Sequence, residues 1–118
     1  MNIEEIREYC ISKKGTEEAF PFDEVTLVFK VMNKMYALLS LDKGTSINLK
    51  CEPEKAIELR ETYNAIIPGF HMNKKHWNTV DYKSNLPDTL VKELIDHSYE
   101  LVVSSLTKKL KKELEEME

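Results

Sequence analysis

Residues 25–51 read VTLVFKVMNKMYALLSLDKGTSINLKC, and this stretch decides the fold class. Apolar and polar residues alternate from Val25 to Val31 and again from Ser46 to Cys51. This period of two, rich in β-branched and aromatic residues, is typical of strands with one buried face. A further apolar run, Met35 to Leu41, lies between them. The stretch therefore predicts three strands.

Two short polar segments separate these strands. Asn33-Lys34 is a two-residue connection, and Asn tolerates the positive φ that a tight hairpin turn demands. Asp42-Lys43-Gly44-Thr45 has the composition of a second turn. The three strands are therefore predicted to form an antiparallel meander.

Helical patterns flank the meander. Ile3, Ile6 and Cys10 share one side of an amphipathic helix that ends before Gly15. A second helix is predicted from Pro53 to near Asn64, because proline suits the first helical position. A fourth strand is expected at 76–82, and a last helix is expected at 87–114. The pattern indicates an α+β domain.

The chain has 118 residues, the length of one domain. We place a single domain at 1–106 and a charged helical C-terminal tail at 107–118. The tail ends in acidic residues, whereas the dipole at the C-terminus of a helix favours cations. We therefore expect the tail to fray. Its apolar stripe offers the alternative of docking on the domain or on a second copy, so a monomer or weak homodimer is predicted.

The sequence indicates a cytoplasmic protein that does not enter the membrane. Acids at 4–5 replace the basic start of a signal peptide, and no stretch approaches the roughly 18 apolar residues of a membrane span. Cys10 and Cys51 are isolated, so we expect reduced, half-buried thiols.

Basic residues are separated from the acids, although the net charge is −4. Residues 25–51 contain four lysines and one acid, and residues 62–80 contain two lysines and no acid. The acids gather in the predicted helices. Because the Debye length is about 8 Å, acidic helices need not cancel a basic sheet on the other side of a domain.

Residues 68–80, PGFHMNKKHWNTV, hold two of the three histidines, the only tryptophan and a lysine pair. We interpret this segment and the meander lysines as a cationic surface with an aromatic platform for nucleic acid. Lysines would contact phosphates, and an exposed indole would stack on a base for about 1–3 kcal/mol. The predicted nucleic-acid-binding residues are Lys30, Lys34, Lys50, His71, Asn73, Lys74, Lys75, His76 and Trp77.

The same segment also has a purely structural interpretation. Trp77 would be a core residue, because tryptophan is usually buried, and both neighbouring lysines would only be solvated. A buried Trp77 or an apolar pocket beside the loop would favour a module that binds a protein or a small ligand. Phe20-Pro21-Phe22 is likewise expected to pack in the core.

Catalytic and metal-binding patterns do not emerge from the sequence. His71 and His76 are five residues apart, without an intervening Cys or acid, so no metal site is predicted. No nucleophile and base share a local signature, and the three glycines are too scattered for a phosphate-binding loop. We predict a protein that is not an enzyme and has no cofactor; a cleft converging on His71, His76 and Asn73 would favour an enzyme instead.

Residues 68–80 also resemble the MmcQ/YjbR-like proteins, and the resemblance extends over nearly the whole chain. Its other matching segments are Phe20-Pro21-Phe22, the hairpin at 29–35, Leu49-Lys50 before the Pro53 helix, and Ser98-Tyr99 with Leu101-Val102-Val103. The resemblance implies a fold like that of CyaY or frataxin, in which N- and C-terminal helices pack on one face of an antiparallel sheet.

The resemblance further implies the family's label, predicted DNA-binding proteins with a double-wing motif. The wings would fall at the Asn33-Lys34 hairpin, where the family commonly has a glycine, and at the Gly69 to His76 loop. We therefore expect a DNA-binding or regulatory domain whose partner is DNA. A non-enzymatic protein or small-ligand binding module is the alternative, and iron binding through Glu4, Glu5 and Glu8, by analogy with frataxin, ranks third.

Overall fold

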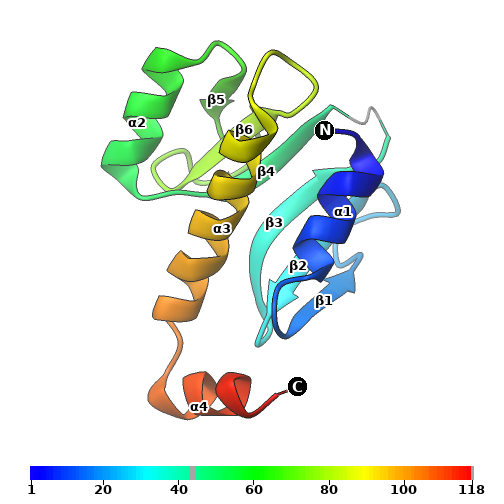
Figure 1. Cartoon of the computed structure of the whole chain (residues 1–118), viewed down its shortest axis with the longest axis vertical. Helices are drawn as coiled ribbons and strands as arrows, with labels where there is room; N and C mark the ends of the chain where they lie inside the picture. Colours follow the sequence, from blue (N-terminus) through cyan, green and yellow to red (C-terminus); the bar gives the residue numbers. More distant parts are fainter. Residues whose placement is uncertain (43–44, 118) are drawn as a thin grey trace.

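The centre of the fold is the antiparallel meander predicted from residues 25–51 (Figure 1). In the computed structural model, which describes residues 1–42 and 45–117, β2 (Thr26–Val31) pairs with β3 (Lys34–Ser40), and β3 pairs with β4 (Ser46–Lys50). The meander is therefore confirmed. Part of the turn predicted at 42–45 lies outside the described residues.

The β2–β3 turn is shifted by one residue from the predicted position. Val31 and Lys34 are register partners, so Met32 and Asn33 form the turn. Both have positive φ, 49° and 68°, as a type I′ hairpin turn requires. Type I′ turns match the right-handed twist of the flanking strands. This match favours the turn although Met32 has to adopt a positive φ in it.

Three further strands complete a six-stranded antiparallel sheet in the order β1-β2-β3-β4-β6-β5. β6 (Trp77–Asp81) lies within the strand predicted at 76–82. β1 (Thr16–Ala19) and β5 (Ile66–Pro68) are edge strands that were not predicted. The sequence TEEA lacks apolar alternation, and IIP is short and ends at a proline, so neither carries a strand signal of its own.

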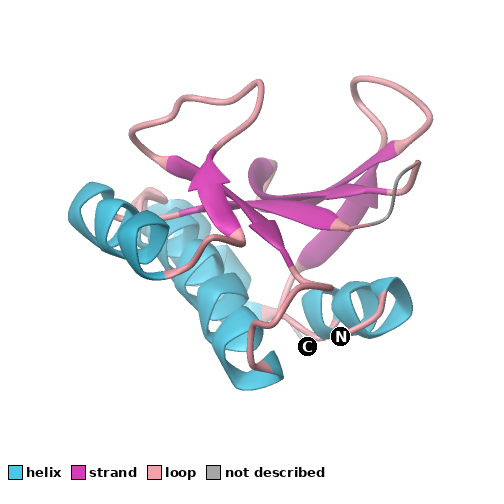
Figure 2. Ribbon diagram, turned by 90° about the horizontal axis from the view of Figure 1, so that it is seen from above, coloured by secondary structure: helices cyan, strands magenta, loops and turns pink. Residues whose placement is uncertain are grey.

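The helices lie on one face of the sheet (Figure 2). They are α1 (Ile3–Ile11), α2 (Pro53–Thr62), α3 (Asp88–Ser104) and α4 (Lys108–Glu116). α3 contacts β2, β3 and β4, and the buried side chains of helices and strands form the main core on this face. Among residues 1–42 and 45–117, no helix covers the opposite face, which we call the open face (Figure 2). The predicted α+β class is confirmed.

Ser98 of α3 joins β3 and β4 where their main-chain pairing stops. The last paired residues at this end are Ala37 and Leu49. Beyond them, the buried Ser98 hydroxyl accepts a hydrogen bond from the Lys50 N–H at 2.9 Å and donates one to the Tyr36 carbonyl at 2.5 Å. The hydroxyl thus bridges two main-chain groups that no longer meet directly.

The C-terminal helix is broken, so the prediction of one helix over 87–114 is wrong. Thr107 has an extended backbone, and its side-chain oxygen accepts a hydrogen bond from the Leu110 N–H at 3.2 Å. A threonine in this conformation is a helix N-cap, and it starts α4 as a separate helix.

α4 docks on the domain, which was the alternative to fraying. Leu114 is buried against Gly15, whose φ of 74° and missing Cβ leave room for the leucine methyl group. The Lys14 ammonium donates to the Glu115 carbonyl at 2.8 Å. The domain boundary at 106/107 stays a prediction.

Both cysteines are free and buried. Burial raises the pKa of the Cys10 thiol to about 12, so this thiol stays protonated. Within the described residues, no helix is long and apolar enough to cross a membrane.

Candidate functional site

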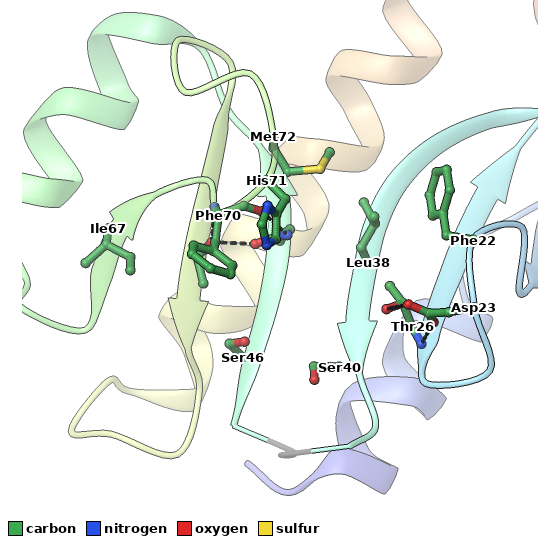
Figure 3. Close-up of a pocket in the computed structure, with 12 residues that line it drawn as sticks. Phe22, Asp23, Thr26, Leu38, Ser40, Ser46, Ile67, Phe70, His71 and Met72 are labelled. Atoms are coloured by element: carbon green, nitrogen blue, oxygen red, sulfur yellow. Dashed lines mark hydrogen bonds between the residues drawn. The ribbon is translucent and has the colours of Figure 1, made fainter.

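The open face carries a hollow of about 550 Å³ between two loops (Figure 3). Phe22, in the loop between β1 and β2, stands on one side. Ile67 of β5 and Phe70, His71 and Met72 of the β5–β6 loop stand on the other. The remaining lining residues are Asp23, Thr26, Leu38, Ser40, Ser46, Asn48 and Thr79.

Phe22 and Phe70 keep their rings in solvent. The two residues are 64% and 63% exposed, and the neighbouring Phe20 is 50% exposed. The prediction that Phe20-Pro21-Phe22 packs in the core is therefore wrong. These residues lie in the loop after the edge strand β1, and none of them belongs to the main core beneath the helices.

Hydrogen bonds from the floor of the hollow hold Phe70 in place. The Phe70 N–H donates to the Thr79 hydroxyl oxygen at 2.9 Å, and the Asn48 amide nitrogen donates to the Phe70 carbonyl at 3.4 Å. The Thr79 hydroxyl in turn donates to the Asn48 amide oxygen at 2.5 Å. The main-chain position of this exposed phenylalanine is thus fixed by β4 and β6.

Gly69 allows the β5–β6 loop to close tightly over Trp77. The Gly69 N–H donates to the Trp77 carbonyl at 2.8 Å. A Cβ at position 69 would lie 2.8 Å from the Trp77 Cβ and 3.0 Å from the Met72 Cβ. Only glycine fits without displacing these neighbours, so Gly69 in the Pro68-Gly69-Phe70 turn allows close approach of the backbone.

Arg60 of α2 holds the other end of this loop, and sequence reasoning missed it. Its guanidinium donates to the Asn78 amide oxygen at 2.6 Å, to the Trp77 carbonyl at 3.3 Å, and to the Lys74 carbonyl. A signal was present: the spacing from Ala56 to Arg60 places the arginine on the buried side of α2, where its donors need partners.

Trp77 is buried, which contradicts its predicted role as a stacking platform. The residue is 9% exposed, and its side chain packs with Val28 and Leu38. Met35 and Met72 cover this second small core on the open face. The indole has no free face to offer to a base. This burial agrees with the structural interpretation, in which Trp77 is a core residue.

The polar residues of the β5–β6 loop largely stabilise the loop itself. The Lys74 ammonium donates to the Gly69 carbonyl at 3.0 Å, and the Asn73 amide oxygen accepts from the Lys75 N–H at 3.0 Å. The His76 carbonyl accepts from the Cys51 N–H at 2.7 Å. Lys75 is exposed and lies in the same loop.

Lys30, Lys34 and Lys50, the meander lysines predicted to bind nucleic acid, do not share one surface. Lys30 and Lys50 alternate with core residues of β2 and β4, so they lie on the open face. Glu17, an acidic residue of the edge strand β1, is the register partner of Lys30. Lys34 is the register partner of Val31, which belongs to the main core. The side chain of Lys34 therefore lies on the helix side of the sheet.

His71 is the one member of the group His71, His76 and Asn73 that lines the hollow. It has φ 61°, an uncommon conformation for a residue with a Cβ, and its ring lies 4.1 Å from the Phe70 ring. The three residues therefore do not converge on a common cleft.

The hollow contains one charged carboxyl group, that of Asp23. The Val25 N–H, together with the Thr26 N–H and hydroxyl, lowers the pKa of Asp23 below its ordinary value. The twelve lining residues, all in the described part of the chain, include no lysine and no arginine. The hollow therefore has no permanently charged cation for an acidic ligand group, and His71 is its one basic side chain.

No metal-binding group appears among the described residues, where no three His, Cys, Asp or Glu side chains are gathered for an ion. Glu5 instead forms a capping box with Asn2 at the start of α1. This arrangement gives no support to iron binding through Glu4, Glu5 and Glu8.

The fold and the site define an α+β protein with one layer of helices and a hollowed open sheet face. The YjbR family model matches residues 11–101, and the chain belongs to the YjbR family. The predicted family resemblance is therefore confirmed.

Two curated relatives are similar in sequence to most of the chain, and a solved structure shares its fold. The uncharacterised protein YjbR of Escherichia coli (strain K12) is 33% identical over 113 residues, which cover 95% of this chain and 96% of that protein. The uncharacterised protein YbdF of Escherichia coli O157:H7 is 39% identical over 94 residues, 79% of this chain and 77% of that protein. The crystal structure of Deinococcus radiodurans protein DR2400 has a TM-score of 0.88 at 41% identity, and the match covers 96% of this chain and 87% of that one.

Proposed function

We propose that this protein is a non-enzymatic binding module whose ligand occupies the hollow on the open face. One observation carries the proposal: two exposed phenylalanine rings and a floor of hydroxyl and amide groups border the same space of about 550 Å³. Ligand sites typically have volumes of roughly 300–1,000 Å³ and combine apolar walls with a few placed polar groups.

The rigidity of the β5–β6 loop supports the proposal. Gly69, Arg60 and the buried Trp77 hold this loop on β6, and Asn48 and Thr79 hold Phe70. A wall that is already ordered loses little conformational freedom when a ligand binds.

A ligand screen by NMR tests the proposal. Neutral, cationic and anionic compounds are added to ¹⁵N-labelled protein, and we expect at least one class to shift the amide signals of Asn48, Phe70 and Thr79 together. Phe70→Ala should abolish these shifts. Phe20→Ala is the matched control, because Phe20 is exposed in the same loop as Phe22 but does not line the hollow. A screen in which these signals never move contradicts the proposal.

A second candidate, DNA binding, is favoured by the position of three lysines. Lys30 and Lys50 lie on the open face, and Lys75 is exposed in the loop beside it. If Lys50 and Lys75 contact phosphates, their joint replacement by alanine should reduce the slope of log binding constant against log salt by about 1.8 for duplex DNA. Lys109→Ala on α4 is the control. Absence of binding at low salt, or an unchanged slope, would exclude these contacts.

A further inference from the structure

The hollow carries a negative charge at one end. Asp23 is the one described lining residue that is fully charged at neutral pH, because the main-chain N–H groups of Val25 and Thr26 donate to its carboxylate and lower its pKa. Figure 3 shows Asp23 beside Phe22 and Thr26, across the hollow from His71. The one basic lining residue therefore does not neutralise this end of the hollow.

The Asp23 carboxylate can still accept a hydrogen bond from a ligand. A carboxylate offers about four acceptor positions. Oδ1 accepts from the Val25 and Thr26 N–H groups at 2.9 and 2.7 Å, and Oδ2 accepts from the Thr26 hydroxyl at 3.2 Å. Within the described residues, one position on Oδ2 is left. Asp23 is also exposed, so a cation that binds beside it need not remove all of its water.

A second carboxylate lies at the same end of the open face. Asp81 is the register partner of Ser46, which lines the hollow. Register partners project to the same face of a sheet, so the Asp81 side chain also lies on the open face. Thr26 is likewise the register partner of Ser40, and both line the hollow. Hydroxyl groups and two acids are thus gathered where β2 and β4 begin.

The lysines of the open face lie at the other end of these strands. Lys30 is four residues from Thr26 along β2, and Lys50 is four residues from Ser46 along β4. At about 3.3 Å per residue, each lysine is roughly 13 Å away. This distance exceeds the Debye length of about 8 Å, so salt screens most of their effect. Lys83, in the turn after β6, does not line the hollow.

The remaining lining of the hollow is largely apolar. Leu38 and Met72 belong to the small core of the open face, and Ile67 of β5 is 49% exposed. Their aliphatic side chains are in contact with the space of the hollow. A ligand with a hydrocarbon body would remove this surface from water, which is favourable.

We infer that the hollow binds a small organic cation, with its ammonium group beside Asp23 and its apolar body against Leu38, Ile67 and Met72. The inference rests on the proposed function and names the class of its ligand. A space of about 550 Å³ lies within the usual range of small-ligand sites. A neutral ligand gains only the apolar contacts, and Asp23 repels an anion.

Three six-carbon compounds that differ in their polar end test the inference. They are hexylamine, which is a cation at pH 7, neutral hexanol and anionic hexanoate. Each is titrated at low salt into ¹⁵N-labelled protein, and the amide signals of Asn48, Phe70 and Thr79 are followed. The hexylammonium ion should bind about threefold to fivefold more tightly than hexanol, which is the scale of one exposed charge pair, and hexanoate should bind more weakly than hexanol. Methylammonium lacks the chain and should bind at least about tenfold more weakly than hexylammonium.

Asp23→Asn separates the charge of the hollow from the net charge of the protein. Asparagine keeps an oxygen for the Val25 and Thr26 N–H groups and loses the charge, so hexylammonium and hexanol should bind alike. Glu24→Gln is the matched control, because Glu24 is exposed in the same loop and does not line the hollow. It removes the same unit of charge and should keep the preference for the cation.

The outcomes separate the inference from the proposed function. Equal affinities of the wild type for hexylammonium and hexanol, or tighter binding of hexanoate, would overturn the inference while the binding module stands. An equal loss of preference in Asp23→Asn and Glu24→Gln would overturn it too, because net charge would then explain the preference. If no compound of either experiment moves the hollow signals, both fail.

Discussion

Replacing Arg60 by leucine tests whether this side chain holds the β5–β6 loop on the domain. The substitution removes the donors to Asn78, Trp77 and Lys74. Asn78 is 2% exposed, so its amide oxygen loses the charged partner and water cannot easily replace it. A buried acceptor left unpaired costs about 1–3 kcal/mol, so with the weaker carbonyl contacts we expect a loss of about 2–3 kcal/mol in the free energy of unfolding.

Urea denaturation followed by tryptophan fluorescence measures this loss. Trp77 is the only tryptophan and lies beside the affected hydrogen bonds, so it reports on this region. With a slope of about 2 kcal/mol per molar urea, the midpoint should fall by roughly 1 M. Arg60→Lys should recover only part of the loss, because lysine lacks the planar fork of donors.

The chain offers a matched control, because Arg7 is its other arginine. Arg7 pairs with Glu18 at 2.6 Å, but the two side chains are 53% and 28% exposed. An exposed pair contributes about 1 kcal/mol or less, so Arg7→Leu should change the midpoint little. Equal urea midpoints for Arg60→Leu and Arg7→Leu would show that Arg60 does not hold the β5–β6 loop on the domain.

Three further predictions concern α3 and the buried thiol. Ser98→Ala leaves the Lys50 N–H and the Tyr36 carbonyl without the bridging hydroxyl. We expect the free energy of unfolding to fall by about 1–3 kcal/mol and the Lys50 amide hydrogen to exchange faster. An unchanged exchange rate at Lys50 would contradict the bridge. Burial, and after it the charge of a nearby lysine, lowers the pKa of His97 in the folded protein. Neutral His97 therefore contributes its full stability above the unfolded pKa of about 6.5, and this contribution is lost as the pH falls toward the folded pKa. The urea midpoints at pH 8 and pH 5 should differ less in His97→Gln than in the wild type. Because burial raises the pKa of Cys10 to about 12, iodoacetamide should modify it at pH 8 only in urea, and rapid labelling of the native protein would show that the thiol is accessible.

Local patterns predicted the central elements of the fold. The period-two alternation in β2 and β4 and the period of α1 depend on neighbouring residues, and the structure has these elements where they were expected. Errors arose where local signals were weak or competed. β1 and β5 lack a pattern of their own, and Thr107 interrupts a continuous apolar stripe with a helix cap.

The candidate site was located only in part from the sequence. Residues 68–80 contain most of the predicted binding residues, but of those only His71 lines the hollow, beside Phe70, which was not predicted. The burial of Trp77 could not be read from its own neighbours. It depends on Val28, Leu38 and Met72, which come from two other strands and from the folded loop above the indole.

The sequence by itself determined the α+β class, the central meander and the family, because these follow from short-range periodicity and from motifs within single segments. Only the tertiary structure decided that Phe22 and Phe70 border one hollow, and that Lys30 and Lys34 lie toward different faces. The reason is physical: sheet order and strand register bring together loops that are far apart along the chain, and a shift of one residue in register moves a side chain to the other face.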